Sequence, residues 1–260
     1  MVKDGSKWAL ILGGSSGLGL ATARKLAQHG FKIIIVHRDR KSELNTVDKA
    51  FREITSKENA LFSFNVDALN PVKRDELILE IQKILGQDKI QVLVHSIAKG
   101  NLKGMADDNN TLSNQDFHLT IDAMAVSLYD WVRSLVAKKL FAEDSRIISF
   151  TSEGNSKAWK SYAAVSAAKA TLEAITRNIA LEFASIGIKA NCIQAGMTDT
   201  RSFQMIPNSD DLKKDAVKRN PNNRLTTPED VANAVYLLTL EEARWITGTV
   251  IKVDGGESLQ

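Results

Sequence analysis

The sequence contains only one cysteine, Cys192, among its 260 residues. A single cysteine excludes an intramolecular disulfide framework and fits a reducing compartment, so we expect a cytoplasmic protein. No apolar run approaches the ~20 residues that a membrane-spanning helix requires. Residues 1–5 contain no apolar signal segment. We therefore expect no membrane partner and no targeting segment at this end of the chain.

An excess of one sign of charge is also missing. The 34 Lys and Arg residues nearly balance the 31 Asp and Glu residues, which leaves a net charge of +3. The basic residues form no stripe interleaved with aromatic residues, so nucleic-acid binding has little support. His118 has no neighbouring Cys or second His, and no metal site is expected. With 43% hydrophobic residues, the chain is long enough for one large domain with a sizeable core.

Short β-branched runs alternate with helix-length amphipathic segments along the chain. The predicted strands are Trp8–Leu12, Lys32–His37, Leu61–Val66, Gln91–His95, Arg146–Phe150, Lys189–Gln194 and Thr249–Val253. The predicted helices are Leu18–His29, Ser42–Ser56, Pro71–Leu85, Ser113–Lys139, Tyr162–Ser185 and Pro228–Thr239. Several strands are apolar almost throughout, which is typical of strands buried on both faces. The alternation predicts an α/β fold, a single Rossmann-type domain over residues 1–260 with a doubly wound sheet of about seven parallel strands.

Two polar segments interrupt this pattern. Asp107–Asn110 is a short polar loop. Arg201–Arg224 is longer and follows the sixth predicted strand, near the edge of the sheet where ligands bind in such folds. We expect a substrate lid around residues 198–225. Basic residues in this segment could attract an acidic partner, although Asp210, Asp211 and Asp215 oppose that field. They are Arg201, Lys213, Lys214, Lys218, Arg219 and Arg224.

A glycine-rich loop joins the first strand to the first helix. It consists of Gly13, Gly14, Ser15, Ser16, Gly17, Leu18 and Gly19. Glycines permit a tight turn and a close backbone approach to a pyrophosphate, and the helix N-terminus supplies free N–H groups. The position of the loop at the start of a βαβ unit predicts a dinucleotide site. An ordinary glycine-rich turn is the alternative.

The end of the second strand predicts which dinucleotide binds. An acidic side chain there would accept a hydrogen bond from the ribose of NAD and repel a 2′-phosphate. In this chain Arg38 stands there, and its paired N–H donors suit a phosphate, while Arg40 and Lys41 add positive charge. The segment therefore predicts NADPH. Asp39 favours the alternative, a solvated charged loop without this role.

Tyr162 and Lys169 are separated by six residues at the start of a long apolar helix. Such a pair suggests an acid and its electrostatic helper. A helix start and a solvated lysine are the alternative. The more common spacing of three residues would put the acid at Val165, which has no proton to give. If the rest of the chain forms a nicotinamide site, this spacing favours one particular branch of hydride-transfer chemistry.

The chain resembles the short-chain dehydrogenase/reductase family over nearly its whole length. The resemblance rests on the glycine loop, Asn65–Val66, Lys189–Thr200 and Val253–Gly256. It implies an adenine contact at Asn65 and Val66. By the same resemblance, Ser152 matches a substrate-orienting serine, and Asp122 replaces a helix asparagine that takes part in a proton relay. A homotetramer is also implied.

Within that family the chain is most similar to the enoyl-[acyl-carrier-protein] reductases, and its ordinary glycine loop resembles the divergent FabL class. This likeness rests on the Tyr162–Lys169 spacing, Val94–Ala98, Ala195–Gly196 and Val253–Leu259. The resemblance implies further residues that line the cofactor cleft or hold its carboxamide and phosphate. These are Ser96, Ile97, Ala98, Ala195, Gly196, Thr198 and Thr200.

The six-residue interval between Tyr162 and Lys169 suits the chemistry of enoyl reduction. In an enoyl thioester the hydride goes to C3, whereas negative charge develops on the more distant thioester oxygen. Seven helical positions give ~10 Å of rise and four give ~6 Å, and both spacings return to nearly the same helix face. Tyr162 would stabilise that oxygen, and Lys169 would hold the ribose hydroxyls of NADPH. Tyr162 and Lys169 are thus predicted catalytic residues, and the family resemblance adds Ser152 to them.

The predicted function is NADPH-dependent reduction of the trans-2 double bond of enoyl thioesters in fatty-acid synthesis. The substrate would be carried on acyl carrier protein or on CoA. One alternative is another short-chain reductase that acts on a 3-ketoacyl thioester, a dienoyl-CoA, a hydroxysteroid or another carbonyl compound. The other is a non-catalytic NADP-sensing protein that retains the fold.

Overall fold

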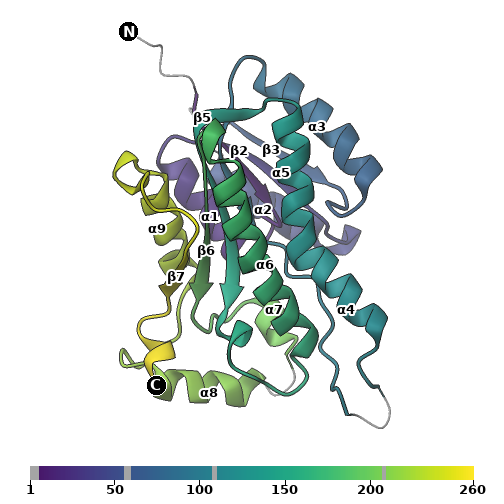
Figure 1. Cartoon of the computed structure of the whole chain (residues 1–260), viewed down its shortest axis with the longest axis vertical. Helices are drawn as coiled ribbons and strands as arrows, with labels where there is room; N and C mark the ends of the chain where they lie inside the picture. Colours follow the sequence, from purple (N-terminus) through teal and green to yellow (C-terminus); the bar gives the residue numbers. More distant parts are fainter. Residues whose placement is uncertain (1–5, 56–59, 107–109, 207–208) are drawn as a thin grey trace.

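The computed structural model describes residues 6–55, 60–106, 110–206 and 209–260. Within these residues one sheet of seven parallel strands has the order β3-β2-β1-β4-β5-β6-β7 (Figure 1). The strands are β1 Trp8–Leu12, β2 Lys32–His37, β3 Leu61–Asn65, β4 Ile90–His95, β5 Phe141–Ser152, β6 Ile188–Ala195 and β7 Val250–Val253. The predicted α/β class and parallel sheet are confirmed.

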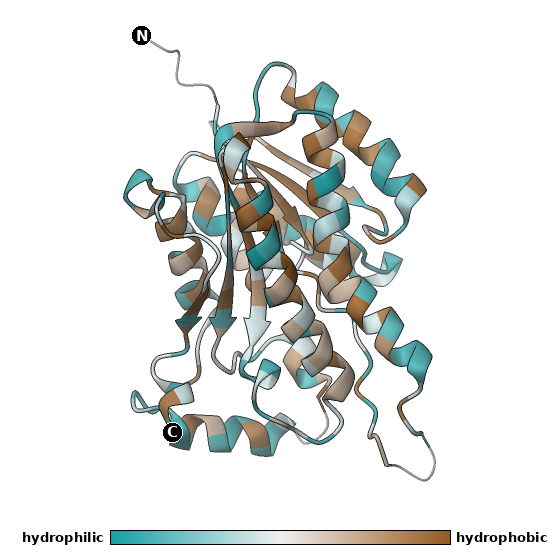
Figure 2. Ribbon diagram, viewed as in Figure 1, coloured by the Kyte–Doolittle hydropathy of each residue, from teal (hydrophilic) through white to brown (hydrophobic). Residues whose placement is uncertain are grey.

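Helices cover both faces of the sheet. The helices are α1 Gly17–Gln28, α2 Leu44–Ile54, α3 Pro71–Leu85, α4 Asn114–Ile121, α5 Ser127–Ala137, α6 Ala163–Glu182, α7 Arg201–Gln204, α8 Ser209–Arg219 and α9 Pro228–Thr239. One core cluster joins the sheet to α3, α5 and α6, and Trp131 is buried at its centre. A second joins the opposite face to α1, α2 and α9. Figure 2 shows hydrophobic residues on the strands between these layers.

β5 begins earlier than the sequence predicts. The predicted strand, Arg146–Phe150, is the apolar centre of an observed strand that runs from Phe141 to Ser152. The first residues pair irregularly with β4, where the register shifts between Ile90 and Val92. Their polar side chains hid this extension from a hydrophobic pattern. At the other end, Ser152 pairs with Ala195, which places Ser152 at the carboxyl edge of the sheet.

The predicted helix Ser113–Lys139 is divided by a π-helical segment, Asp122–Val126, between α4 and α5. A π turn adds a residue to the helical repeat and changes which side chains face inward. Asp122 is exposed, whereas Met124 is buried. Asp122, which by resemblance replaces the relay asparagine, is therefore not among the residues that line the cavity described below.

The predicted lid contains two short helices. α8 lies below the carboxyl ends of the strands, next to the C-terminus (Figure 1). The buried residues Phe203 and Ala216 anchor α7 and α8 to the rest of the protein. Pro207 and Asn208 of this segment, residues 107–109 of the predicted polar loop and Ser56 of the second predicted helix lie outside the described residues.

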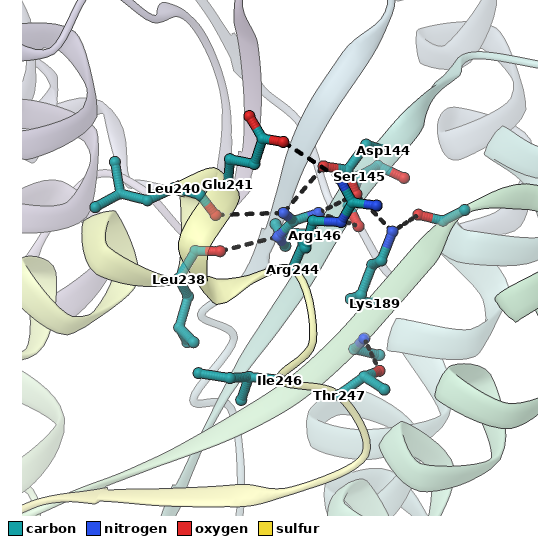
Figure 3. Close-up of polar contacts among 12 residues, drawn as sticks. Asp144, Ser145, Arg146, Lys189, Leu238, Leu240, Glu241, Arg244, Ile246 and Thr247 are labelled. Carbon is teal, nitrogen blue, oxygen red and sulfur yellow. Dashed lines mark hydrogen bonds and ion pairs between the residues drawn. The ribbon is translucent and has the colours of Figure 1, made fainter.

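Arg146, in the first half of β5, joins the sheet to the C-terminal end of α9 (Figure 3). Its guanidinium donates to the carbonyl of Leu238 at 2.9 Å and to that of Leu240 at 3.4 Å, at the C-terminus of the helix. The same group pairs with both carboxylate oxygens of Asp144 at 2.6 and 3.0 Å. Carbonyls at a helix C-terminus have no partner within the helix. Arg146 therefore supplies a donor to two carbonyls at this end, of which that of Leu240 also accepts from the Ala243 N–H at 3.2 Å, and it fixes α9 against β5.

No helix in the described part of the chain has the length and apolar character that a bilayer crossing requires.

Candidate active site

A cavity of about 440 Å³ lies at the carboxyl ends of the strands. It is lined by nearly all of the residues predicted from sequence to belong to the site. These are Gly13, Ser15, Ser16, Gly17, Leu18, Arg38, Val66, Ser96, Ile97, Ala98, Ser152, Tyr162, Lys169, Ala195, Gly196, Thr198 and Thr200. Two predicted residues, Gly19 and Asn65, do not line it. The fold thus gathers segments from across the sequence at one edge of the sheet, as parallel topology requires.

The glycine loop forms a cradle at one wall of the cavity. Gly13 has φ +83°, and a Cβ there would lie 2.4 Å from the carbonyl oxygen of Ser96. Gly19 faces inward, where a Cβ would lie 2.3 Å from the Gly13 oxygen. It therefore allows the helix to pack against the turn and makes no direct contact with the cavity. Ser16, the N-cap of α1, makes no side-chain capping bond, and the first turn carries no acidic residue. This helix end fits an anionic pyrophosphate.

The ends of β2 and β3 meet beside this cradle. Arg38 follows β2, and its guanidinium lies 2.7 Å from the carboxylate of Asp67, which follows β3. Asp67 also accepts a hydrogen bond from the Leu69 N–H. Asn65 does not face the cavity, because its amide group binds the backbone N–H and carbonyl of Asp39 at 3.0 and 3.1 Å. Its expected direct contact with adenine is therefore not supported by this geometry. Asn65 instead fixes the loop after β2.

Tyr162 and Lys169 face the same cavity from the start of α6. The hydroxyl oxygens of Tyr162 and Ser152 are 3.3 Å apart. Lys169 donates from Nζ to the carbonyl oxygen of Phe150 at 2.7 Å, and this anchors the amine to β5. The Tyr162 ring lies against Gly154, where a Cβ would come within 2.4 Å of Cε1. Glycine at position 154 therefore allows the ring to reach Ser152.

Burial determines the ionisation of these groups. Desolvation raises the pKa of Tyr162, although the Ser152 hydroxyl acts in the opposite direction. Tyr162 is thus a neutral O–H donor near neutral pH. Desolvation lowers the pKa of Lys169 to about 8. It also lowers the pKa of His95 to about 3, with a smaller contribution from the charge of Lys169. His95 is therefore neutral, and its Nε2 lies 2.7 Å from the hydroxyl of Ser127.

The rest of the cavity next to Tyr162 is largely apolar. Val165, Met124 and the Tyr162 ring belong to one small hydrophobic cluster. Trp159 packs on Tyr162 with the ring centroids 5.1 Å apart. The other cavity residues of this apolar region are Leu102, Phe203, Met205 and Ile206, three of them from the lid. Side chains of this kind can enclose a hydrocarbon chain but offer it no hydrogen bonds.

An arginine from the lid joins two buried carboxylates beside this region. Arg219 of α8 donates to both oxygens of Glu153 at 3.2 and 3.1 Å and to Glu257 at 2.8 Å. Glu257 also accepts a hydrogen bond from the backbone N–H of Met197, in the loop after β6. Burial raises the pKa of Glu257, against the lowering effects of the Met197 N–H and Arg219. Glu153 directly follows Ser152, so this network connects α8 to the loop after β5.

The other basic residues of the lid are mostly paired within the chain. Arg201 lies 2.5 Å from Glu43, and Arg224 lies 2.6 Å from Asp230. Lys213 and Lys214 pair with Asp199 and Asp211. The suggested docking field for an acidic partner is therefore largely neutralised by the protein's own carboxylates. Sequence reasoning attached this role to Arg219 and missed its contacts with Glu153 and Glu257.

A parallel sheet with a glycine loop after β1 and a Tyr–Lys pair on the helix after β5 defines an oxidoreductase of the short-chain dehydrogenase/reductase class. Residues 13–258 match the family model described as Enoyl-(Acyl carrier protein) reductase, and the chain belongs to this family. Among curated proteins, it is 28% identical to the 3-oxoacyl-[acyl-carrier-protein] reductase FabG of Chlamydia muridarum. That match runs over 255 residues and covers 96% of this chain and 97% of the relative.

Solved structures of enoyl reductases share the fold. The enoyl-acyl carrier protein reductase of Bacillus cereus, solved with NADP+ and indole naphthyridinone, is 28% identical with a TM-score of 0.87. The enoyl-[acyl-carrier-protein] reductase (NADH) of Aquifex aeolicus is 24% identical with a TM-score of 0.84. Each comparison covers 98% of both chains. The curated relatives and solved structures thus include reductases of both 3-oxoacyl and enoyl thioesters.

Proposed function

We propose that this protein is an NADPH-dependent enoyl-thioester reductase that acts on trans-2-enoyl groups carried by acyl carrier protein or CoA. The observation that carries the proposal is the position of Tyr162. Its hydroxyl lies 3.3 Å from Ser152 and faces the cavity, whereas Val165 occupies the position of the more common acid. The buried Val165 belongs to the apolar cluster around Tyr162. The acid is thus displaced by one turn along α6.

The residues of the cradle fit a dinucleotide. The uncapped N-terminus of α1 would hold the pyrophosphate, and Arg38 would hold a 2′-phosphate. Val66 and the segment Ser96–Ala98 would line the adenosine and nicotinamide ribose sites. Gly196, Thr198 and Thr200 would hold the carboxamide end. When bound, NADPH supplies the hydride that reduces C3 of the substrate.

Each catalytic side chain has a distinct task in this proposal. Tyr162 donates its O–H to the thioester oxygen, where negative charge develops as C3 is reduced. Ser152 orients the Tyr162 hydroxyl through their hydrogen bond. Lys169, held by the Phe150 carbonyl, binds the ribose hydroxyls and contributes positive charge. A proton added at C2 completes the saturated thioester.

The apolar region next to Tyr162 suits the acyl chain. Trp159 and Met124 come from the loop before α6 and from the π segment, and Ile206 comes from the lid. Closure of the lid over a hydrocarbon chain would exclude water from the reacting carbons. This arrangement links substrate binding to the Arg219 network, since α7 and α8 belong to one segment.

A 3-oxoacyl-thioester reductase is the second candidate, favoured by the FabG relative and by the presence of Ser152. The two candidates differ in the position of the reacting carbon relative to the charged oxygen. In a ketone the same carbonyl group receives both the hydride and the proton, and the acid must lie closer to the nicotinamide. Val165 at that nearer position disfavours this chemistry.

The test compares NADPH oxidation with crotonyl and acetoacetyl thioesters on the same purified protein, each on CoA and on acyl carrier protein. We expect clear turnover of crotonyl thioester and little turnover of acetoacetyl thioester. The opposite preference would identify a ketoreductase. NADPH binding without turnover of either would favour a sensing protein. The proposal includes a cytoplasmic location and a homotetrameric assembly. Light scattering on the same sample measures the number of subunits.

A further inference from the structure

We propose that His37 determines the preference for NADPH by holding the carboxylate of Asp39 away from the cofactor. The inference rests on the proposed function and identifies a specificity-determining residue for it. Asp39 directly follows Arg38, in the segment where an acidic side chain would select NAD and repel a 2′-phosphate. The sequence alone therefore contains contradictory signals at this point, with Arg38 next to Asp39.

The Asp39 carboxylate is occupied. One of its oxygens lies 2.7 Å from Nδ1 of His37, and only 13% of the Asp39 side chain is exposed. His37 is itself buried at the end of β2, with its ring edge-on to Phe51 of α2 at 5.4 Å. A neutral or protonated imidazole can donate from Nδ1 to this carboxylate. The ring cannot turn away freely, because Phe51 and the strand enclose it.

The backbone of Asp39 is held as well. Asn65 accepts a hydrogen bond from the Asp39 N–H and donates one to its carbonyl, at 3.0 and 3.1 Å. Asn65 is the last residue of β3 and pairs in register with His37. Two neighbouring strand ends thus fix both the main chain and the carboxylate of one loop residue. Asn65 and His37 act on Asp39 from different directions.

The Arg38 side chain is exposed, in contrast to that of Asp39. Its side chain is 56% exposed, and its Nη1 uses the carboxylate of Asp67 as a partner at 2.7 Å. A guanidinium has five N–H donors, so the contact with Asp67 leaves donors for a phosphate. Asp67 is restrained by the Leu69 N–H, and burial, which alone would raise its pKa, is outweighed by that bond and by Arg38. The pair therefore positions Arg38 beside the cavity.

The consequence concerns charge at the 2′ position of the ribose. Arg38 and Asp39 both line the cavity, but with the His37 contact intact the Asp39 carboxylate is bound to the His37 ring and Arg38 is the group available to a phosphate. Without it, a free carboxylate next to Arg38 would repel a 2′-phosphate and accept a hydrogen bond from a 2′-hydroxyl. His37 is thus the residue that allows an acidic loop to accept NADPH.

The experiment measures the dissociation constants of NADPH and NADH for the full-length protein by quenching of its intrinsic fluorescence, without a thioester. His37→Phe keeps an aromatic ring against Phe51 and removes the donor. We expect the preference for NADPH over NADH to fall at least about tenfold. Asn65→Ala, which frees the Asp39 backbone, should change the preference in the same direction. In each background, the addition of Asp39→Asn should restore the wild-type preference, because the released charge is then absent.

Circular dichroism establishes that each variant is folded. An unchanged preference in folded His37→Phe and Asn65→Ala would overturn the inference. A change that Asp39→Asn does not reverse would also overturn it, since the effect would then not arise from the carboxylate. Failure of the wild-type protein to bind either dinucleotide would instead contradict the proposed function. The two failures are therefore distinguishable.

Discussion

The hydroxyl of Tyr162 lies 3.3 Å from that of Ser152, at the point where β5 ends and α6 begins. Ser161, directly before Tyr162, has a left-handed φ of +60°, and this turn directs the tyrosine into the cavity. Non-glycine residues adopt such a φ at a cost of about 1 kcal/mol, which the surrounding contacts must offset. The relationship places a neutral donor next to an orienting hydroxyl.

Substitution of Tyr162 by Phe removes the donor and keeps the ring against Gly154 and Trp159. We expect kcat with a trans-2-enoyl thioester to fall by about 10²–10³-fold, the range for loss of one oxyanion donor. NADPH affinity, measured by fluorescence titration, should stay unchanged. Ser152→Ala removes only the orienting bond, and a loss of up to about tenfold is expected. Equal turnover of Tyr162→Phe and wild type would exclude the assigned role.

The lowered pKa of Lys169 should make catalysis depend on pH near neutrality. Its pKa of about 8 means that the amine is charged below pH 8 and neutral above it. We expect kcat/KM, which reports the free enzyme, to fall as the pH rises through about 8. In Lys169→Arg the guanidinium stays charged, so this fall should disappear even if the absolute rate is lower. A pH profile of the arginine variant that still falls near pH 8 would assign the titration to another group.

The lowered pKa of Lys169 also affects stability. In the unfolded chain Lys169 keeps its proton up to the ordinary lysine value of 10.5, whereas the folded chain loses it near pH 8. Between these values the unfolded state binds more protons. The contribution of Lys169 to the free energy of unfolding therefore increases with pH from about 8 to 10.5, which urea denaturation at a series of pH values measures. Below pH 8 its buried charge is a constant cost.

The contacts of Arg219 with Glu153 and Glu257 should hold α8 in place. Arg219→Met removes the guanidinium from Glu153 and Glu257, which keep their contacts with Lys157 and with the Met197 N–H, respectively. We expect KM for the thioester to rise, NADPH affinity to change little, and hydrogen exchange of α8 amides to accelerate. Lys218→Met, on the exposed face of the same helix, is the matched control and should leave all three values unchanged. The same effect in both variants would mean that the network does not hold the lid.

The contacts of Arg146 should stabilise the folded protein at a place far from the candidate site. Arg146→Met removes the guanidinium donor from the Leu238 and Leu240 carbonyls, of which that of Leu240 keeps its hydrogen bond from the Ala243 N–H. The free energy of unfolding should fall by about 2–4 kcal/mol. Arg244→Met is the matched control. Arg244 forms only an exposed pair with Glu241 at 3.2 Å, seen beside Arg146 in Figure 3. Its loss should cost less than about 1 kcal/mol. Urea denaturation measures both, and equal effects would contradict the assigned role of Arg146.

The sheet could be predicted from sequence because its strands are contiguous apolar runs. Ile33–Val36, for example, is fully buried, and no other element in an α/β chain requires such a run. The start of β5 was missed because residues 142–145 are mostly polar. The π segment was missed because it has no compositional signal and only changes which residue, Asp122 or Met124, faces inward.

In the candidate site, too, local sequence signals were predictable and long-range contacts were not. Glycine spacing and the Tyr162–Lys169 interval are local signals, and the residues they indicate line the cavity. The contacts of Arg219 join residues 66 and 38 positions apart, which no local pattern contains. Asn65 stands at the expected position, but its side chain turns to the neighbouring strand end. The direction of a side chain at a strand end depends on its tertiary partner, here the Asp39 backbone.

The central claim is that the protein reduces a carbon–carbon double bond with Tyr162 acting at the distant thioester oxygen. The most direct measurement uses NADPH that carries deuterium at the transferable C4 position of the nicotinamide, with crotonyl thioester as substrate, and mass spectrometry and NMR of the product. The account predicts butyryl thioester with one deuterium at C3. Absence of labelled butyryl thioester, together with deuterium transfer to C3 of acetoacetyl thioester to give 3-hydroxybutyryl thioester, would contradict it.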